Sequence, residues 1–182
     1  DSTGAILIST IAGGDNALTL STGDNINANV NMSIISSASS GITTLTLRDI
    51  GGKFFTNGNI SVATLSVDNT VHDVSFTGGT NVFTNAVTFQ NDGTLELGNA
   101  AGDTFTFNGG VTESTSGTVT LASTISSSND VISFGAVTLG ANTIIDTNAS
   151  NTTGDLTLGV VTGGSNTLTL STGNNVANTD IS

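Results

Sequence analysis

The chain has 182 residues, of which 36% are hydrophobic and only 9% charged, and its formal net charge is −12. Two Lys or Arg side chains face 14 acidic ones, so the chain lacks the basic clusters that bind nucleic-acid phosphates or anionic membranes. The absence of Cys excludes disulfides and thiolate metal sites, and no apolar run approaches the ~20 residues that span a bilayer. We therefore expect neither nucleic-acid binding nor membrane insertion.

Short strands with a period of two dominate the sequence. Apolar residues alternate with Thr or Ser, which places the apolar side chains on one face of each strand. No stretch shows the 3.6-residue apolar stripe of an amphipathic helix, so we predict an all-β chain. In chain order, the alternating segments are 17–20, 44–47, 64–67, 87–89, 95–97, 105–107, 119–121, 132–134, 137–139, 156–158 and 168–170.

Gly-Gly, Asn-Gly and Asn-Asp pairs separate these segments and adopt turn conformations at little cost. Two architectures suit short strands with frequent turns: an antiparallel sandwich and a parallel β-helix, or β-solenoid. The Leu-x-Leu pairs recur at irregular intervals near one coil length, and Pro is absent, which favours the solenoid. We predict one solenoid segment over residues 1–182, with about seven to eight coils stacked at the usual strand spacing.

One phrase occurs twice. GGDNALTLSTGDN at 13–25 and GGSNTLTLSTGNN at 163–175 are identical at ten of thirteen positions, at an offset of 150 residues. Such self-similarity is typical of repeat architectures. Asp15 and Asp24 of the first copy are neutral residues in the second, whereas the alternating core of the phrase persists. We interpret the repeat as a feature of the scaffold and not as a binding motif.

Candidate catalytic residues are few. Arg48, Lys53 and His72 are the only basic side chains, and they lie in one region of the sequence. A carbohydrate-cleaving β-helix would need clustered acids beside Arg or Lys, and the chain has no Trp or Tyr to stack on sugars. We expect these three residues to pair with neighbouring Asp at the surface, and we expect no enzyme, no catalytic residue and no cofactor.

The sequence raises two further ligand hypotheses, calcium and ice. Asp15, Asp24 and Asp92 place hard oxygen ligands in turns, but the Gly-Gly-x-Gly-x-Asp calcium repeat is absent, so we expect turn roles and no metal site. Thr-x-Thr pairs invite an ice-binding interpretation, which needs such pairs in register on one flat side. Their uneven spacing favours Thr as a strand former. The pairs are 44/46, 104/106, 118/120 and 167/169.

Most Phe residues alternate with polar residues and are expected to stack in the core. Phe54 and Phe55 are adjacent, so one of them faces outward and is the apolar contact candidate. The six expected core positions are Phe76, Phe83, Phe89, Phe105, Phe107 and Phe134.

Several phrases resemble the repeats of large bacterial surface proteins: VSFTGGT (74–80), FNGGVT (107–112), SFGAVTLGANTII (133–145) and GDLTLGVVTGGSNTLTL (154–170). They are similar to the degenerate β-strand repeats of filamentous-haemagglutinin-like exoproteins and autotransporter passenger domains. The resemblance covers most of the chain and implies a right-handed parallel β-helix, export to the cell surface and a role in adhesion or as a stalk. Without Pro, the chain cannot carry the Asn-Pro motifs of the haemagglutinin secretion domain.

We therefore expect a non-enzymatic, extracellular or cell-surface solenoid that acts as a structural or adhesive rod or filament. Both ends of the sequence read as strand without a polar cap, so we expect either end-to-end self-association or continuation of a longer repeat array. Host-cell, surface or glycan contacts would follow from such a role. A carbohydrate-binding or carbohydrate-active β-helix is the alternative. A functional amyloid-like fibre subunit, with one flat layer per chain, is the second.

Overall fold

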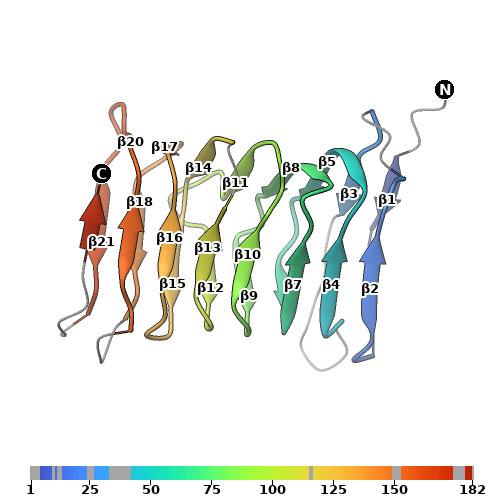
Figure 1. Cartoon of the computed structure of the whole chain (residues 1–182), viewed down its shortest axis with the longest axis horizontal. Helices are drawn as coiled ribbons and strands as arrows, with labels where there is room; N and C mark the ends of the chain where they lie inside the picture. The colour runs from blue at the N-terminus through green and yellow to red at the C-terminus, as the bar shows by residue number, and fades with distance from the viewer. Residues whose placement is uncertain are drawn as a thin grey trace.

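The computed structural model describes residues 5–9, 11, 14–23, 27–32, 42–114, 117–148, 153–173 and 179–181. These residues form 22 short β-strands, which wind into an elongated coil with the two termini at opposite ends (Figure 1). Within the described ranges, no helix is long and apolar enough to cross a membrane.

Three parallel sheets run along the coil. The first comprises β1 (Ile6–Ile8), β3 (Val30–Met32), β5 (Ile50–Thr56), β8 (Val71–Phe76), β11 (Leu95–Leu97), β14 (Val119–Leu121), β17 (Val137–Leu139) and β20 (Val161–Thr162). The second comprises β6 (Ile60–Val62), β9 (Thr80–Phe83), β12 (Thr104–Phe107), β15 (Thr124–Ser127), β18 (Thr143–Asp146) and β21 (Leu168–Ser171). The third comprises β2 (Ala17–Leu20), β4 (Thr44–Leu47), β7 (Thr64–Val67), β10 (Val87–Phe89), β13 (Val111–Glu113), β16 (Ile132–Phe134), β19 (Leu156–Leu158) and β22 (Thr179–Ile181).

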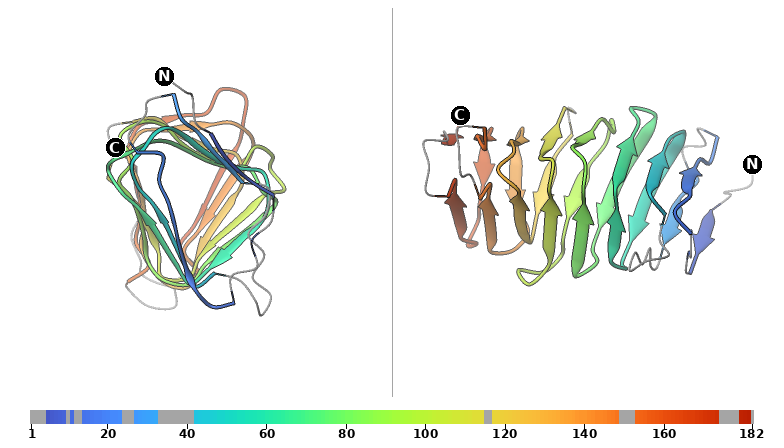
Figure 2. Two further views of the ribbon diagram at one scale, coloured as in Figure 1. Left: turned by 90° about the vertical axis from the view of Figure 1, so that its right-hand side faces the viewer. Right: turned by 90° about the horizontal axis from the view of Figure 1, so that it is seen from below.

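The chain visits the first, second and third sheets in turn and then returns to the first, one strand further along the rod. Seen along its axis, the coil encloses a three-sided core (Figure 2). Every described strand pair between turns is parallel, for example β11 with β14 and β16 with β19. The predicted parallel β-solenoid is confirmed, and the antiparallel sandwich is excluded.

The number of complete turns is smaller than the expected seven to eight. Six turns have a strand in all three sheets, and the two N-terminal turns have described strands only in the first and third sheets. The length of a turn also varies. Leu18 pairs with Leu45 after 27 residues, whereas Val119 pairs with Val137 after only 18. The corners absorb this variation, because the strands keep their register while the connections change in length.

Inward side chains stack into apolar ladders, as the alternation predicts. The ladder of the first sheet runs from Ile6 at one end to Val161 at the other, and each member lies directly above its partner in the next turn. Between them it contains Val30, Phe54, Val74, Leu95, Val119 and Val137, all buried. Burial of these ladders away from water is the main stabilising term for the fold.

Aromatic residues fill the middle of the rod. All six Phe residues expected in the core are fully buried, which confirms that prediction. Phe76 lies at the centre, with its ring centroid 5.4 Å from Phe54, 5.9 Å from Phe83 and 6.5 Å from Phe105. Of the adjacent pair, Phe54 points into the core, while Phe55 points outward and is half-buried.

Candidate functional site

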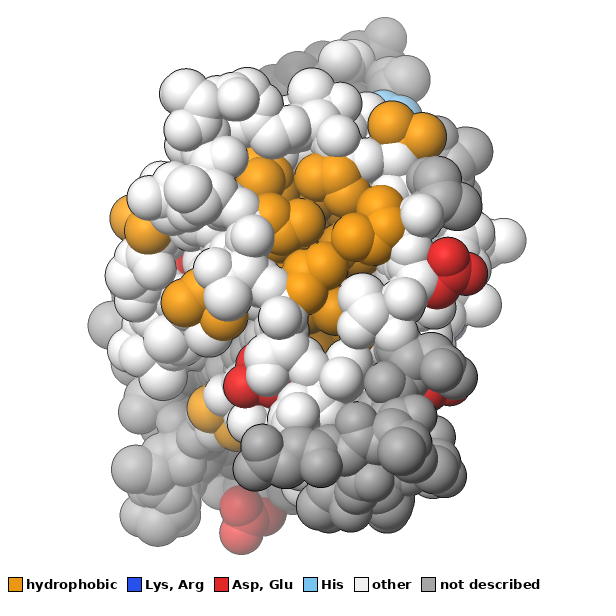
Figure 3. Space-filling view, turned by 90° about the vertical axis from the view of Figure 1, so that its left-hand side faces the viewer, with side chains coloured by type: hydrophobic (Ala, Val, Ile, Leu, Met, Phe, Trp, Pro, Cys, Tyr) orange, Lys and Arg blue, Asp and Glu red, His pale blue; other side chains and the backbone are white. Residues whose placement is uncertain are grey.

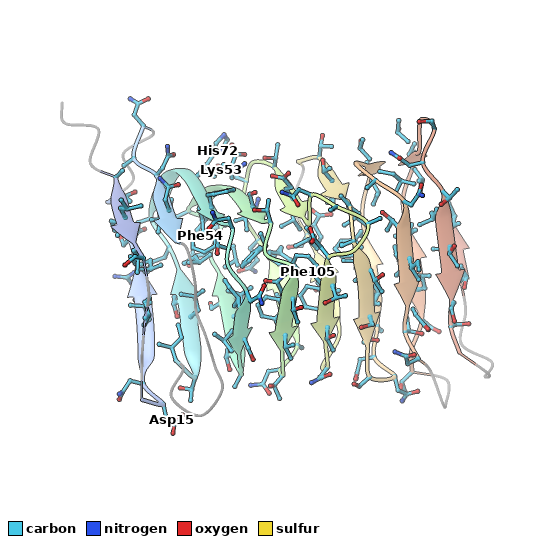
Figure 4. The ribbon with its side chains drawn as sticks, turned by 180° about the vertical axis from the view of Figure 1, so that it is seen from behind. Asp15, Lys53, Phe54, His72 and Phe105 are labelled. Atoms are coloured by element: carbon cyan, nitrogen blue, oxygen red, sulfur yellow. The ribbon has the colours of Figure 1, made fainter. Side chains whose placement is uncertain are left out.

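A group of ionisable side chains lies on the outer face of the first sheet and its adjoining corner. Lys53 comes from β5, His72 and Asp73 from β8, and Glu96 from β11, so three successive turns contribute. Figure 4 shows Lys53 and His72 close together along one edge of the rod, with Phe54 beneath them in the core. We call Lys53, His72, Asp73, Asp92 and Glu96 the charged cluster.

Glu96 is the centre of one half of this cluster. The register of the first sheet places Phe55, Ser75 and Glu96 in line on the outer face. Ser75 Oγ donates a hydrogen bond of 2.6 Å to Glu96 Oε2, and Lys53 Nζ lies 3.5 Å from the same oxygen. The Lys53 ammonium also lies 5.9 Å from the centroid of the Phe55 ring. These neighbours cover Ser75, which is fully buried although it faces outward.

His72 forms the other half with Asp92 from the next turn. His72 Nδ1 and Asp92 Oδ1 lie 2.7 Å apart, and both side chains are at least half exposed. The hydrogen bond to Asp92 raises the pKa of His72 above its ordinary value, and slight desolvation opposes this without cancelling it. The negative charges of Asp73 and Asp92 act in the same direction as the hydrogen bond.

Asp73 is held in its ionised form. Partial burial favours its neutral form, but Thr94 donates hydrogen bonds to Asp73 Oδ1 from its backbone N, at 2.7 Å, and from its Oγ1, at 2.8 Å. These bonds, with the positive charges of His72 and Lys53, hold the pKa of Asp73 below its ordinary value. A carboxyl group stabilised as its anion in this way is poorly suited to act as a general acid.

The predicted basic residues have partners, although one partner differs from the expectation. Arg48 Nε lies 3.5 Å from the neighbouring Asp49 Oδ2, and His72 pairs with Asp92. Lys53 pairs with Glu96 and not with an Asp. The cluster can therefore hold charges of both signs in fixed positions on the rod surface. Its carboxylates accept hydrogen bonds from Lys53 within the cluster and from Ser75 and Thr94 beside it.

The two calcium candidates among the described residues, Asp15 and Asp92, do not converge. Asp15 lies in an exposed turn with φ of 63°, in the left-handed region that suits Asp in turns, and Figure 4 shows it at the edge of the rod opposite His72. Asp92 pairs with His72, and Asp24 lies outside the described residues. In the part of the chain that the structure describes, no three His, Asp or Glu side chains are grouped to hold a metal ion.

The predicted Thr-x-Thr pairs are spread over all three sheets. The pair at 44/46 lies on β4, the pair at 104/106 on β12 and the pair at 167/169 reaches β21, while Thr120 is on β14. The second sheet aligns Thr104/Thr106 with Thr124/Ser126, but Val82 precedes them and Ile144/Asp146 follow. A continuous double row of hydroxyls, which an ice-binding face would need, is therefore interrupted.

A single row of hydroxyls on the third sheet was not expected from the sequence. The register lines up one outward Thr or Ser from each of seven successive turns, and two of them, Thr88 and Thr112, are within hydrogen-bonding distance at 3.1 Å between their Oγ1 atoms. The row is Thr19, Thr46, Ser66, Thr88, Thr112, Ser133 and Thr157. Only the strand register reveals it, because the sequence separation between neighbours changes from turn to turn.

The pairs within the charged cluster were also missed, although the sequence contains a signal for them. His72 and Asp92 are 20 residues apart, and Asp73 and Thr94 are 21 apart, as are Ser75 and Glu96. Two of these separations equal the 21-residue length of the local turn, and that of His72 and Asp92 is one residue shorter. A search for complementary polar residues one coil apart would have found all three pairs.

Comparison with known proteins gives no match to a protein-family model, to a curated protein sequence or to a solved structure.

Proposed function

We propose that this chain is a non-enzymatic, extracellular structural segment that builds a rod or filament at a bacterial cell surface, as its resemblance to filamentous-haemagglutinin-like exoproteins and autotransporter passengers implies. The observation that carries the proposal is the open end of the core. Further solenoid turns, either from a second copy or from a longer repeat array, would complete it.

The C-terminal end of the rod presents apolar side chains to solvent. Figure 3 looks onto this end and shows a central apolar patch, ringed by polar atoms and backbone. Val161, Leu168 and Leu170 belong to the last strands of the first and second sheets and are only partly buried against the core. Ile181, on the last strand of the third sheet, is 52% exposed.

The N-terminal end is similar. Ile6, Ile8, Ile11 and Leu18 pack against the core but remain partly exposed. The outermost strand of each sheet at either end also leaves one edge of backbone N–H and C=O groups unpaired in the described chain. An unpaired strand edge over an apolar core is a template for another strand, so both ends favour stacking.

The sides of the rod support a structural role. Outward positions are mostly Thr, Ser and Asn, and the charged cluster engages its own carboxylates through Thr94, Ser75 and Lys53. Such a surface keeps a rod in solution while leaving broad faces for weak, repeated contacts with host cells or other surfaces. Adhesion by many weak contacts would need no single deep site.

Purified protein tests the proposal. We expect negative-stain images to show rods much longer than the ~40 Å that eight stacked turns span at the usual strand spacing. Replacing Leu170 by Asp should leave short rods, because a charge then sits on the apolar end. The matched control is Thr88→Asp on β10, an exposed outward position in an inner turn between the neutral Ser66 and Thr112, which should still form long rods. Short, uniform rods from the unaltered chain would refute self-association.

A carbohydrate-binding role is the second candidate, because the charged cluster places Lys53 beside Glu96 and close enough to Asp73 to affect its pKa. Phe55 supplies the one half-buried aromatic ring near these groups. Calorimetric titration with neutral and acidic oligosaccharides tests this role. Binding that is lost in both Lys53→Ala and Phe55→Ala, with Arg48→Ala as the control, would favour it over a purely structural rod.

A further inference from the structure

The two copies of the repeated phrase lie on different sheets of the solenoid. The described parts, residues 14–23 and 163–173, contain β2 and β21. β2 is the outermost strand of the third sheet at the N-terminal end, whereas β21 is the outermost strand of the second sheet at the C-terminal end. The two copies of the phrase therefore lie on neighbouring sheets around the rod.

Both copies nevertheless fold in a similar way, although Asp15 has a positive φ of 63° and its counterpart Ser165 does not. The second glycine of each phrase has a similar positive φ, 54° at Gly14 and 59° at Gly164, and the last does too, 73° at Gly23 and 76° at Gly173. The amide of the last glycine donates a hydrogen bond to the Ser Oγ two residues earlier, at 3.3 Å in each copy. The phrase thus encodes one corner, one strand and a second corner, whichever sheet it joins.

The likeness extends to the whole turn around the phrase. β1 precedes the first copy and pairs with β3 one turn later, and β19 precedes the second copy and pairs with β22 one turn later. Ile11 forms an isolated bridge in the first turn at the position that corresponds to Val161 on β20 in the second. The last turn is therefore a copy of the first turn, moved around the rod by one sheet.

The pairing of β2 inside the rod shows which kind of strand can lie beside this phrase. On the C-terminal side of β2 lies β4, in register, with Leu18 against Leu45, Thr19 against Thr46 and Leu20 against Leu47. The edge of the phrase is thus covered by another Leu-Thr-Leu strand. The corresponding edge of β21 has no strand beside it in the described chain.

A second copy offers a strand of this kind. Its β2 is a Leu-Thr-Leu strand whose outer edge is also uncovered in the described chain. We propose that copies stack head to tail with each copy turned by one sheet about the rod axis, so that β2 of one copy pairs in parallel with β21 of the copy before it. This inference rests on the proposed function, because it specifies the register of end-to-end association.

We call this arrangement, with β2 of one copy beside β21 of the copy before it, the turned register. It brings the following side chains of the two ends together. Leu18 meets Leu168, Leu20 meets Leu170, and Ile8 of β1 meets Ile181 of β22, all at inward positions. Asp15 meets the neutral Ser165, so this carboxylate is not stacked on another. In either register an apolar residue lies on Thr179, Ile6 with the turn and Leu18 without it. The match that distinguishes the turned register is therefore the one between the two copies of the phrase, because without the turn β2 would lie on β22 and not on β21.

Engineered cysteines can distinguish the three ways in which two three-sided ends can meet. Thr19 is exposed on β2. Its neighbour in the copy before it would be Thr169 in the turned register, Asp180 without a turn, and Thr162 with a turn in the other direction. Adjacent strands are ~4.8 Å apart, within the Cα separation that a disulfide can bridge. The natural chain has no Cys, and Thr19 lies at the opposite end of the rod from all three partners, so any disulfide joins different copies.

The double variants T19C/T169C, T19C/D180C and T19C/T162C are oxidised at a concentration where fibres form, and the products are separated on non-reducing gels. We expect T19C/T169C to give a ladder of covalent multimers, several-fold more abundant than from either other pair. The single variant T19C should give dimers at most. Unchanged melting temperatures would show that all variants fold.

Each other outcome overturns the inference in a recognisable way. A dominant ladder from T19C/D180C or T19C/T162C, with fibres still visible by microscopy, would show that copies stack in another register while the proposed function holds. Equal ladders from all three pairs would show that the ends select no register. Absence of both multimers and fibres would refute end-to-end association itself.

Discussion

Single residues in this solenoid act mostly on the turns above and below them. Asn81 is fully buried, and its side chain accepts a hydrogen bond from the Ile60 amide of the turn before and donates to the Thr104 carbonyl of the turn after. Buried polar groups need such partners, because an unpaired one costs free energy. A polar side chain near a corner therefore fixes the register between turns.

His72 should make stability depend on pH. Its pKa is raised above the ordinary value of 6.5 by Asp92, so the pair stabilises the fold fully below 6.5 and loses this contribution as pH rises through the pKa in the folded chain. The effect should be below about 1 kcal/mol, because the pair is exposed. We expect the difference in melting temperature between the unaltered chain and His72→Gln to shrink as pH rises. A difference that grows with pH would contradict the assigned pairing.

Gly78 is required for the close approach of two turns. A methyl carbon on Gly78 would lie well inside van der Waals contact with the backbone of Gly58 and Asn59, whereas one on Gly102 would meet nothing within 4 Å. We expect Gly78→Ala to lower the free energy of unfolding by roughly 1–3 kcal/mol, as overpacking does, and Gly102→Ala to change it little. Urea unfolding of both variants measures this. Equal stability of the two would show that the turns can separate at little cost.

At the scale of the strands, the aromatic core divides the rod into a strong middle and weaker ends. Strands β5 to β13 contribute seven of the Phe rings, and six of those rings contact at least one other within 6.5 Å, centroid to centroid. The terminal strands β20 to β22 contribute Val161, Leu168 and Leu170, which are only partly buried. A solenoid is stabilised turn by turn, so local stability should follow this gradient.

Phe76→Ala should therefore be among the most destabilising substitutions. The side chain is fully buried and contacts four other rings, so its loss leaves a cavity and should cost roughly 3–5 kcal/mol. Leu168→Ala on the terminal strand should cost clearly less. Hydrogen exchange would locate the effect, since we expect amides of β8 and its neighbours to lose protection in Phe76→Ala. Equal effects of the two substitutions would contradict the gradient.

The strands themselves were largely predictable, but their assignment to sheets was not. Alternation identified Leu45, Leu65 and Leu156 as inward residues, because a strand with one buried face must alternate. The sheet to which each strand belongs depends on the corners, and turns of 18 to 27 residues hide the coil period. For this reason the sequence predicted paired surface charges at Lys53 and His72, but not that Glu96 and Asp92 from later turns would be their partners.

The molecule as a whole combines polar sides with apolar ends, and this difference in surface chemistry favours some modes of assembly over others. Contacts between sides are opposed by a net charge of −12 and by outward Thr, Ser and Asn. Contacts between ends would bury Leu170 and Ile181 and pair strand edges that are uncovered in the described chain. An amyloid-like layer of one flat strand set per chain is a different arrangement, because each chain here already forms several stacked turns. Growth along the axis is therefore the favoured mode.

Salt should strengthen this axial growth. Because pH 7 is far above the pI of about 4.1, each of two approaching rods carries a charge of −12, and they repel each other. Added salt shortens the screening length to about 8–10 Å near physiological ionic strength, which weakens this repulsion but leaves apolar and strand–strand contacts intact.

We therefore expect the concentration needed for fibre formation, measured by light scattering and microscopy, to fall as NaCl is raised. Leu170→Asp at the same salt is the control, because it should remain as short rods and so separates ordered growth from precipitation. Fibres that dissolve as salt is added would mean that complementary charges, and not the apolar ends, hold the copies together.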